Sequence, residues 1–320
     1  MERVRFWGTR GSLPVALTAD TVRAKILAAL RGAQGRAFAT DEELAAYVDG
    51  LPFAMRGTFG GHSPCVELVT GGPDYVICDL GSGVRPFGGS VLARHGSTPQ
   101  TFHVFMSHVH WDHIMGFPFF VPAYRPGNRI VIYGGHEELE AALRRQQAAP
   151  SFPVDFSALG ATIEFVRLEP GRRHDIADMQ VELLLQRHAG DSYGYRFTGG
   201  GHTVVYSTDS EHTLADPEDT DRFVAFFRDA DVVVFDAMYS LADAISVKAD
   251  WGHSSNIVGV DLCRMAGARH LCLFHHEPVH DDEALSRILG ETRRYEELAR
   301  WPGAPVLQVS TAYDGMEIVL

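Results

Sequence analysis

Residues 105–113 read FMSHVHWDH. The apolar run that leads into this segment predicts a β-strand ending near Ser107, so the histidines begin where the strand stops. His108 and His110 lie two residues apart in extended chain, which places both imidazoles on one face. Asp112 and His113 follow where the chain turns into a short helix, so their side chains can reach a second ligand position nearby. Four ligand-type side chains in one short segment indicate a dinuclear metal site, with ions roughly 3.5–4 Å apart.

Short runs of β-branched and aromatic residues, punctuated by glycine and proline, predict strands on both sides of this segment. In the first half they cover residues 4–8, 65–70, 75–79, 102–107 and 129–134. In the second half they cover residues 162–167, 179–186, 193–198, 203–208, 231–236 and 270–274. A final hairpin is predicted from residues 305–309 and 316–320, and the three glycines at 199–201 fit a tight turn between two strands.

Apolar residues at a 3.6-residue period predict helices over residues 137–147, 219–228, 256–266 and 282–301. Strands and helices together predict an α+β fold of the αββα sandwich type. In such a fold two sheets, here expected to be mostly antiparallel, pack face to face with helices on both outer faces. No linker or low-complexity tract divides the 320 residues, so we expect a single domain over residues 1–320.

Residues 17–51 stand apart from this pattern. Two helical patterns, over residues 21–31 and 41–48, are inserted between the first and the second predicted strand. The simplest interpretation is a helical hairpin on the surface. A lid over the site and an arm that joins two copies of the chain in a homodimer are the functional alternatives.

The composition limits the partners of the chain. With 28 basic and 41 acidic side chains the formal net charge is −13, which argues against tRNA or DNA as a partner because such binding depends on Lys and Arg. No apolar run approaches the roughly 18 residues of a membrane span, and the N-terminus lacks a signal-peptide pattern. The four cysteines show no metal-type spacing, so we expect reduced thiols in a cytoplasmic protein.

The motif His-x-His-x-Asp-His resembles the signature of the metallo-β-lactamase-fold hydrolases. FWGTRGS at residues 6–12 resembles the opening strand and turn of the ribonuclease Z and cyclic-phosphodiesterase branch, and CDLGSG at residues 78–83 resembles the acidic turn before the metal motif. Later motif positions are matched by His188, by Asp209 in YSTD, by His253 in GHSS and by His275. The order and spacing agree along nearly the whole chain.

This resemblance implies a set of seven metal ligands. One ion would be held by His108, His110 and His188, the other by Asp112, His113 and His275, with Asp209 bridging the two. Ligation by imidazole and carboxylate suits two Zn²⁺ ions, with Mn²⁺, Fe and Ni²⁺ as alternatives. Side chains of neighbouring residues at a strand end point in opposite directions, so one of His275 and His276 is the ligand, and the motif favours His275.

Asp112 and His253 are the candidate catalytic residues. We expect His253 to lie outside the ligand set and to protonate the leaving group, the alternative being a structural histidine before a helix. We expect Asp79 to support a ligand rather than to bind metal itself. Arg10 is expected to hold a turn or to bind phosphate, and His62 to lie in a loop or to line the pocket. Other histidines, expected to be solvated or capping, are His136, His174, His202, His212 and His280.

The spacing between two of the ligand candidates bears on the substrate. Only a short stretch separates His188 from Asp209, which leaves no room for the long tRNA-gripping arm that ribonuclease Z inserts there. We therefore predict a hydrolase that uses a hydroxide between two metal ions to cleave a small nucleotide or sugar phosphodiester, cyclic substrates included. Hydrolysis of a lactone, ester or thioester at the same centre is the first alternative. A ligand sensor without turnover is the second.

Overall fold

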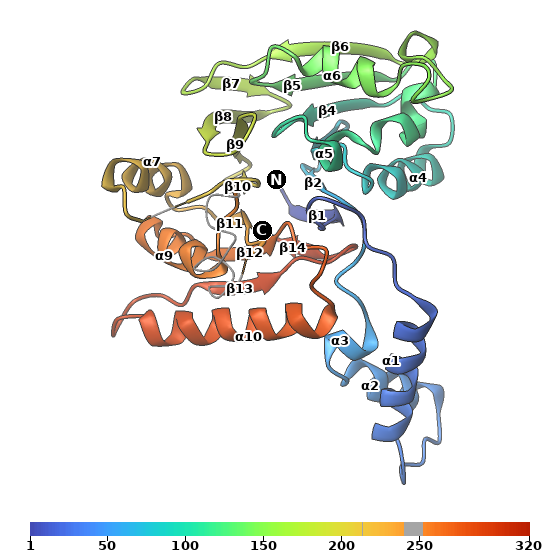
Figure 1. The fold of residues 1–320 in the computed structure, drawn as a ribbon, viewed down its shortest axis with the longest axis vertical. Coiled ribbons are helices and arrows are strands. Elements are labelled where there is room, and N and C mark those ends of the chain that lie inside the picture. The colour runs from blue at the N-terminus through green and yellow to red at the C-terminus, as the bar shows by residue number, and fades with distance from the viewer. Residues whose placement is uncertain (213, 240–251) are drawn as a thin grey trace.

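The computed structural model describes residues 1–212, 214–239 and 252–320. Its strands form two sheets of seven, ordered β14-β1-β2-β3-β4-β5-β6 and β13-β12-β11-β10-β9-β8-β7. Figure 1 shows the first sheet running from the two termini to the top of the molecule, and the second running beside it down to α10. The predicted sandwich of two sheets with helices outside is confirmed.

The first sheet contains β1 (Arg3–Gly8), β2 (Cys65–Val69), β3 (Tyr75–Cys78), β4 (Thr101–Phe105), β5 (Arg129–Gly134), β6 (Thr162–Arg167) and β14 (Glu317–Val319). The second contains β7 (Arg173–Ile176), β8 (Met179–Gln186), β9 (Ser192–Gly199), β10 (His202–Ser207), β11 (Val232–Asp236), β12 (His270–Phe274) and β13 (Gln308–Thr311). The α-helices are α1 (Ala19–Gly32), α2 (Asp41–Asp49), α3 (Phe53–Arg56), α4 (Val84–His95), α5 (Trp111–Ile114), α6 (Leu139–Gln146), α7 (Pro217–Phe227), α9 (Asn256–Ala266) and α10 (Asp282–Ala299). Three short 3₁₀ helices are η1 (Phe117–Phe119), η2 (Val121–Tyr124) and η3 (Phe156–Ala158).

Each sheet is mixed rather than mostly antiparallel. The pairs β3–β4, β4–β5 and β5–β6 are parallel in the first sheet, as are β10–β11, β11–β12 and β12–β13 in the second. The remaining pairs are antiparallel. The difference has a simple cause, because each parallel pair is joined by a crossover that contains a helix, and such crossovers return the chain in the same direction.

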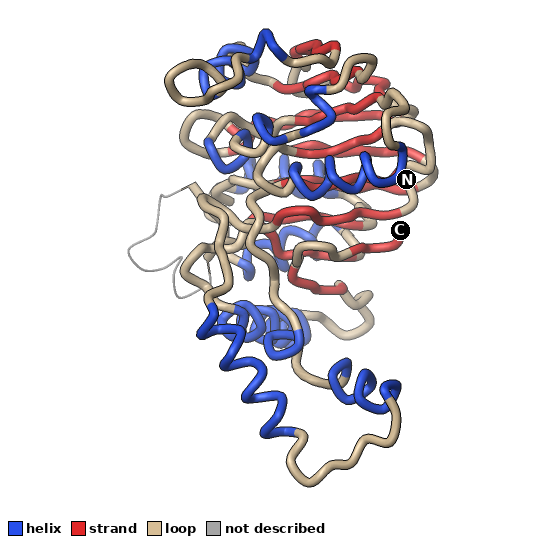
Figure 2. The backbone as a smooth tube through the Cα atoms, turned by 90° about the vertical axis from the view of Figure 1, so that its right-hand side faces the viewer, coloured by secondary structure: helices blue, strands red, loops and turns tan. Residues whose placement is uncertain are grey.

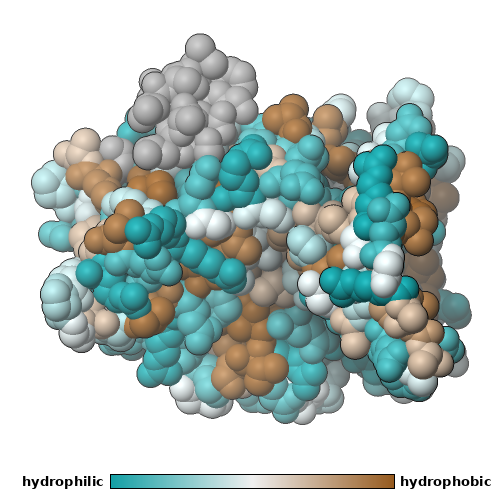
Figure 3. All heavy atoms as spheres, turned by 90° about the horizontal axis from the view of Figure 1, so that it is seen from below, coloured by the Kyte–Doolittle hydropathy of each residue, from teal (hydrophilic) through white to brown (hydrophobic). Residues whose placement is uncertain are grey.

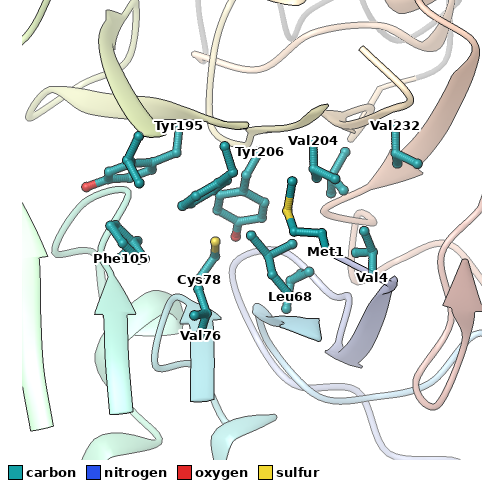
Figure 4. Packing of buried hydrophobic residues seen from close by; sticks show 14 of the residues in the cluster. Met1, Val4, Leu68, Val76, Cys78, Phe105, Tyr195, Val204, Tyr206 and Val232 are labelled. Carbon is teal, nitrogen blue, oxygen red and sulfur yellow. The ribbon is translucent and has the colours of Figure 1, made fainter. Parts of the chain in front are cut away.

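Three hydrophobic clusters define the layers. The central cluster lies between the sheets, and Figure 4 shows Phe105 and Cys78 of the first sheet pointing toward Tyr195 and Tyr206 of the second. A second cluster joins β10–β13 to α7, α9 and α10, and a third joins β3–β5 to α4, α5 and α6. Helices therefore cover the outer face of each sheet, and the sandwich buries apolar side chains on both faces of its central strands.

The predicted elements include one wrong strand pairing, and they omit helix α4 and strand β7. The segments predicted as a final hairpin belong to different sheets, because β13 pairs with β12 and β14 pairs with β1. Helix α4 was not predicted because it contains Pro86, Gly88 and Gly89, all poor helix formers. Pro86 lies in the first turn, where a missing N–H costs little. Gly88 faces the Phe120 ring, which a Cβ atom would approach to 2.9 Å.

The glycine turn at residues 199–201 has the predicted form. Strands β9 and β10 pair as an antiparallel hairpin, and His202 lies opposite Gly199. Gly200 and Gly201 have φ angles of 60° and 82°. Positive φ at both central positions is the requirement of the tight turn that suits the twist of a hairpin, and glycine adopts it without strain.

The segment of residues 17–51 projects away from the sheets. Helices α1 and α2 extend below the body in Figures 1 and 2, and neither contains a buried residue. Tyr47 ties them together by donating its hydroxyl proton to the Ala29 carbonyl at 2.7 Å. Seen from below, hydrophobic residues interrupt the hydrophilic surface on this side of the molecule (Figure 3). No described helix is both long and apolar enough to span a membrane.

His212 is not the solvated or capping residue that the sequence suggested. It is buried, and its ring stacks on Phe235 and meets the Phe223 ring edge-on. Neither ring nitrogen has a hydrogen-bond partner among the described residues. Burial lowers the pKa of His212 to about 3, so the imidazole is neutral in the folded protein.

Replacing His212 by phenylalanine should remove an acid sensitivity of the fold. Because its pKa is depressed on folding, His212 takes up a proton more readily in the unfolded chain, and the native state loses about 1.4 kcal/mol per pH unit below about pH 6.5. From pH 7 to pH 5, the stability of His212→Phe should therefore rise by about 2 kcal/mol relative to wild type. Urea unfolding at both pH values measures this, with His174→Gln on edge strand β7 as control. Parallel pH dependences for wild type and His212→Phe would contradict the assignment.

Candidate metal centre

The candidate ligands converge where several strands end. His108 to His113 follow β4, His188 follows β8, Asp209 follows β10 and His275 follows β12. Strands β8, β10, β11 and β12 run in one direction in the second sheet, so their carboxyl ends meet at one edge. The end of β4 in the first sheet faces this edge. The sandwich thus gathers side chains that are up to 167 residues apart, from His108 to His275, into one cluster.

The first group consists of His108, His110, His188 and Asp209, whose ligand-type atoms all lie within 4.8 Å of one another. His188 Nε2 lies 3.2 Å from His110 Nδ1 and 3.7 Å from Asp209 Oδ2. His108 Nε2 lies 3.6 Å from the same Asp209 oxygen. The other nitrogen of His188 faces the Gly252 carbonyl at 2.8 Å, which fixes the ring.

The second group consists of Asp112, His113 and His275. His113 Nε2 and His275 Nε2 lie 3.3 Å apart, and Asp112 Oδ2 is 3.2 and 3.3 Å from them respectively. Asp209 Oδ1 is 3.2 Å from both imidazole nitrogens. The two oxygens of Asp209 therefore face different groups, Oδ2 the first and Oδ1 the second.

Asp209 and His275 reach these positions through unusual backbone conformations. Their φ angles are 48° and 60°, in the left-handed region that side-chain-bearing residues rarely adopt. His275 comes directly after β12 and Asp209 two residues after the end of β10, so the chain turns sharply there and points each side chain into the cluster. Backbone strain of this kind persists only where the surroundings enforce it, and it is concentrated at functional sites.

The group of donors fits a metal ion. His108 Nε2 is buried and has no hydrogen-bond partner among the described residues, although such an atom is normally satisfied. Burial would raise the pKa of Asp209, but His275, His113 and His108 outweigh it and hold this pKa well below its usual range. A buried carboxylate surrounded by imidazole nitrogens is the donor set that Zn²⁺ and related divalent ions prefer.

Asp79 contacts His113 of the second group on the side away from the cluster, and it thus supports a ligand, as expected from the sequence. This fully buried carboxylate accepts hydrogen bonds from Ser107 N at 2.7 Å and from the Tyr206 hydroxyl at 2.7 Å. Its Oδ2 lies 2.8 Å from His113 Nδ1. The contact places the proton on Nδ1 and leaves His113 Nε2 as a lone-pair donor toward the cluster.

Asp236 is a site residue that the sequence reasoning missed. It ends β11 and is fully buried, and its Oδ2 accepts from Ser210 N at 3.1 Å and faces His253 Nδ1 at 2.8 Å. The available signal was the run VVVFD at residues 232–236, an acid at the end of an apolar strand like Asp79 in YVICD. Without the fold, nothing in the sequence links this acid to His253.

His253 lies closer to the ligands than the sequence suggested. Its ring stacks on that of His275 at 5.2 Å, and one of its nitrogens forms a third group with Asp209 and His275. Since Nδ1 is engaged by Asp236, Nε2 is the nitrogen available to the site. Burial alone would lower the pKa of His253, but the Asp236 carboxylate outweighs it and raises this pKa to about 9.

An N-terminal loop closes the site from the other side. The Ser12 N–H donates to Asp112 Oδ2 at 2.8 Å, and Gly11 N–H donates to the His276 carbonyl. A Cβ atom on Gly11 would come within 2.4 Å of His275 Nδ1. The loop therefore passes so close to the ligands that only glycine fits at position 11, and it holds Asp112 through its backbone.

The remaining candidates lie outside the two groups. His276 points away from His275 and contacts the Ala312 carbonyl at 2.8 Å, and burial lowers its pKa to about 3. Arg10 donates to the carbonyls of Gly60, Glu277 and His280, so it holds the loops together. His62 is half-buried, and its Nδ1 lies 3.1 Å from the Ser82 hydroxyl near α4. The four cysteines are buried and unpaired.

The chain is similar to several known proteins. A family model described as Beta-lactamase superfamily domain matches residues 84–276. Probable metallo-hydrolase YhfI of Bacillus subtilis is 25% identical over 270 residues, which cover 79% of this chain and 100% of YhfI. The ribonuclease Z of Oceanobacillus iheyensis is 22% identical over 241 residues, covering 60% of this chain and 76% of the enzyme.

Solved structures agree with these matches. The crystal structure of YhfI superposes with a TM-score of 0.64 and 16% identity, covering 99% of both chains. A diphosphatase from the PhnP family gives a TM-score of 0.59 and 19% identity, covering 99% of this chain and 97% of that one. The family model covers more than half of the chain. The chain therefore belongs to the β-lactamase superfamily and is a metal-dependent hydrolase of the metallo-β-lactamase fold.

Proposed function

We propose that this hydrolase is a dinuclear phosphodiesterase that cleaves a small nucleotide or sugar phosphodiester, cyclic substrates included. The observation that carries the proposal is the position of Asp209, whose two oxygens face two separate groups of ligand-type atoms. A single ion would need only one of these groups. Two groups that share one carboxylate are the arrangement expected for a pair of ions that clamps an in-line displacement at phosphorus.

The proposed ligands are His108, His110 and His188 for one ion and Asp112, His113 and His275 for the other, with Asp209 between them. Imidazole-rich N/O ligation favours zinc. Divalent ions bound there would neutralise charge on the phosphoryl group and acidify a water molecule. The chain's own contribution is orientation, because Asp79 fixes the tautomer of His113 and the Ser12 N–H fixes one oxygen of Asp112.

His253 is proposed as the general acid. Asp236 holds its Nδ1, so Nε2 faces the cluster, where the leaving oxygen of a bound phosphodiester would lie. A carboxylate behind a histidine orients the ring and stabilises its protonated form. A phosphodiester with a poor leaving group needs such a proton, whereas a lactone or a thioester with an activated leaving group depends on it less.

A small substrate is favoured over tRNA. The relatives named ribonuclease Z act on RNA by their names, but here β9 and β10 connect His188 to Asp209 through a tight hairpin without an inserted arm. The net charge of −13 also provides little basic surface for a polyanion.

Replacing the bridging carboxylate should remove both ions' shared ligand. After dialysis against buffer with a low zinc concentration, we expect wild-type protein to retain two zinc ions per chain and Asp209→Ala to retain at most one. Turnover of bis(p-nitrophenyl) phosphate should fall at least about 100-fold, since even indirect supports of metal ligands are worth 10–100-fold. Elemental analysis and steady-state assays measure both quantities. Asp175→Ala, an exposed aspartate of β7, is the control.

Two ions retained by Asp209→Ala, or one ion in wild type, would contradict the dinuclear assignment. If wild type holds two ions but hydrolyses only lactones or thioesters, the metal centre stands and the phosphodiester assignment falls.

The fall in kcat/KM caused by removing the proposed general acid should depend on the leaving group. For His253→Ala we expect kcat/KM to fall by about 10²–10⁴ on methyl phenyl phosphate, because general acid catalysis contributes that much. The loss should stay below about 10-fold on methyl p-nitrophenyl phosphate, whose leaving group is stable as an anion. Asp236→Asn should show the same pattern more weakly. Equal losses on both esters would contradict an acid role, and metal content measured in parallel excludes loss of ligation.

A further inference from the structure

His188 and His113 are held by different kinds of partner. The Nδ1 of His113 faces the carboxylate of Asp79 at 2.8 Å, whereas the Nδ1 of His188 donates to the main-chain carbonyl of Gly252 at 2.8 Å. Because a carbonyl oxygen can only accept, the proton of His188 lies on Nδ1, and Nε2 presents its lone pair to the first group. The direction of this lone pair therefore depends on how firmly Gly252 is held.

Gly252 cannot fix the direction of its carbonyl by itself. Its φ angle is 82°, and glycine has more backbone freedom than any other residue. A Cβ atom at this position would come within 2.7 Å of His188 Nδ1, so a residue without a side chain is needed for the carbonyl to approach the ring. Contacts from other parts of the chain must therefore hold the backbone of Gly252 in place.

Glu211 supplies contacts on both sides of the bond between His188 and Gly252. Its Oε2 accepts a hydrogen bond from the Gly252 N–H at 3.2 Å. Its own N–H donates to the carbonyl of Arg187, the residue directly before His188, at 2.8 Å. Glu211 is half-buried and follows the shared carboxylate Asp209 by two residues. One residue thus connects three segments of the site: the chain after β10, the chain before His188 and the start of the GHSS motif.

The same contact bears on the proposed general acid. Gly252 directly precedes His253, and the ring centroids of His188 and His253 lie 5.2 Å apart. Beyond His253 the motif is tied to the same chain segment again, because the Ser254 hydroxyl donates to the Ser210 carbonyl. A displacement of Gly252 would therefore move the candidate ligand and the proposed acid together.

We propose that Glu211 is a positioning residue, which directs His188 Nε2 toward the first metal ion and holds His253 beside the same centre. Its carboxylate belongs to none of the groups of ligand-type atoms found among the described residues, so it acts through Gly252 and not as a ligand. The part of the inference that concerns His253 rests on the proposed function, whereas the part that concerns His188 needs only the metal centre. The contact is a hydrogen bond to an oxygen acceptor, so an amide oxygen at the same distance can replace the carboxylate.

Zinc affinity, measured by competition with a chromophoric chelator, tests the contact without any substrate. Glu211→Ala removes the acceptor, and Glu211→Asp keeps the charge but is one methylene too short to reach the Gly252 N–H. In both variants we expect the zinc dissociation constant at one site to rise about 10- to 100-fold, the usual effect of losing an indirect support of a ligand. Glu211→Gln should retain the wild-type affinity because its amide oxygen still accepts the bond. Glu218→Ala, which removes an exposed glutamate of α7, is the matched control.

Wild-type zinc affinity in Glu211→Asp would overturn the proposal. So would a loss in Glu211→Gln as large as that in Glu211→Asp, because the charge of the carboxylate would then matter and not its hydrogen bond. Circular dichroism of the metal-free proteins shows whether each variant folds. If Glu211→Ala does not fold, the comparison of Glu211→Asp with Glu211→Gln still decides the question.

The part that concerns His253 is tested with zinc at saturation, so that loss of metal does not contribute. We expect kcat/KM of Glu211→Asp to fall at least about 10-fold more on methyl phenyl phosphate than on methyl p-nitrophenyl phosphate, since a displaced acid loses part of its 10²–10⁴-fold contribution. Equal losses on the two esters would overturn this part. If wild type cleaves neither ester, the proposed function fails, and the order of zinc affinities still decides the role of Glu211 toward His188.

Discussion

The site depends on one buried carboxylate whose two oxygens serve two different sets of imidazoles. Asp209 comes after β10, turns through a left-handed backbone conformation and lies within 3.7 Å of His108, His113, His188 and His275. A buried carboxylate is costly without compensation, and here imidazole nitrogens surround it. Most of the other features of the site hold these imidazoles in position. They include the left-handed turns at Asp209 and His275 and the supporting acids Asp79 and Asp236.

The two sheets position these groups because both are built in the same way. Each sheet combines three antiparallel and three parallel pairs, and the parallel half of each delivers strand ends to the same edge. An acid ends or follows a central strand on either side, Asp79 after β3 and Asp236 at the end of β11. Each carboxylate holds the Nδ1 of one histidine, His113 or His253. The two halves of the fold thus orient one histidine each by the same device.

Much of the fold and part of the candidate site could be predicted from the sequence. Short β-branched and aromatic runs predict the two sheets of the sandwich. The motif of closely spaced ligands identifies one half of the site, because the local spacing of His108 to His113 fixes which side chains can converge. The other half came through motif resemblance, since His188, Asp209 and His275 are distant in sequence. Asp236 could not be found in this way, because its role arises only when β11 and the start of α9 are placed together. The burial of His212 was likewise hidden, as its aromatic neighbours come from α7 and β11.

The central claim is that two metal ions share Asp209, and anomalous diffraction at the zinc absorption edge tests it most directly. Crystals of zinc-loaded protein should show two peaks, one among His108, His110 and His188 and one among Asp112, His113 and His275, with Asp209 between them. A single peak would contradict the account. A peak held by His253 in place of either group would also contradict it, because His253 could then not serve as the acid.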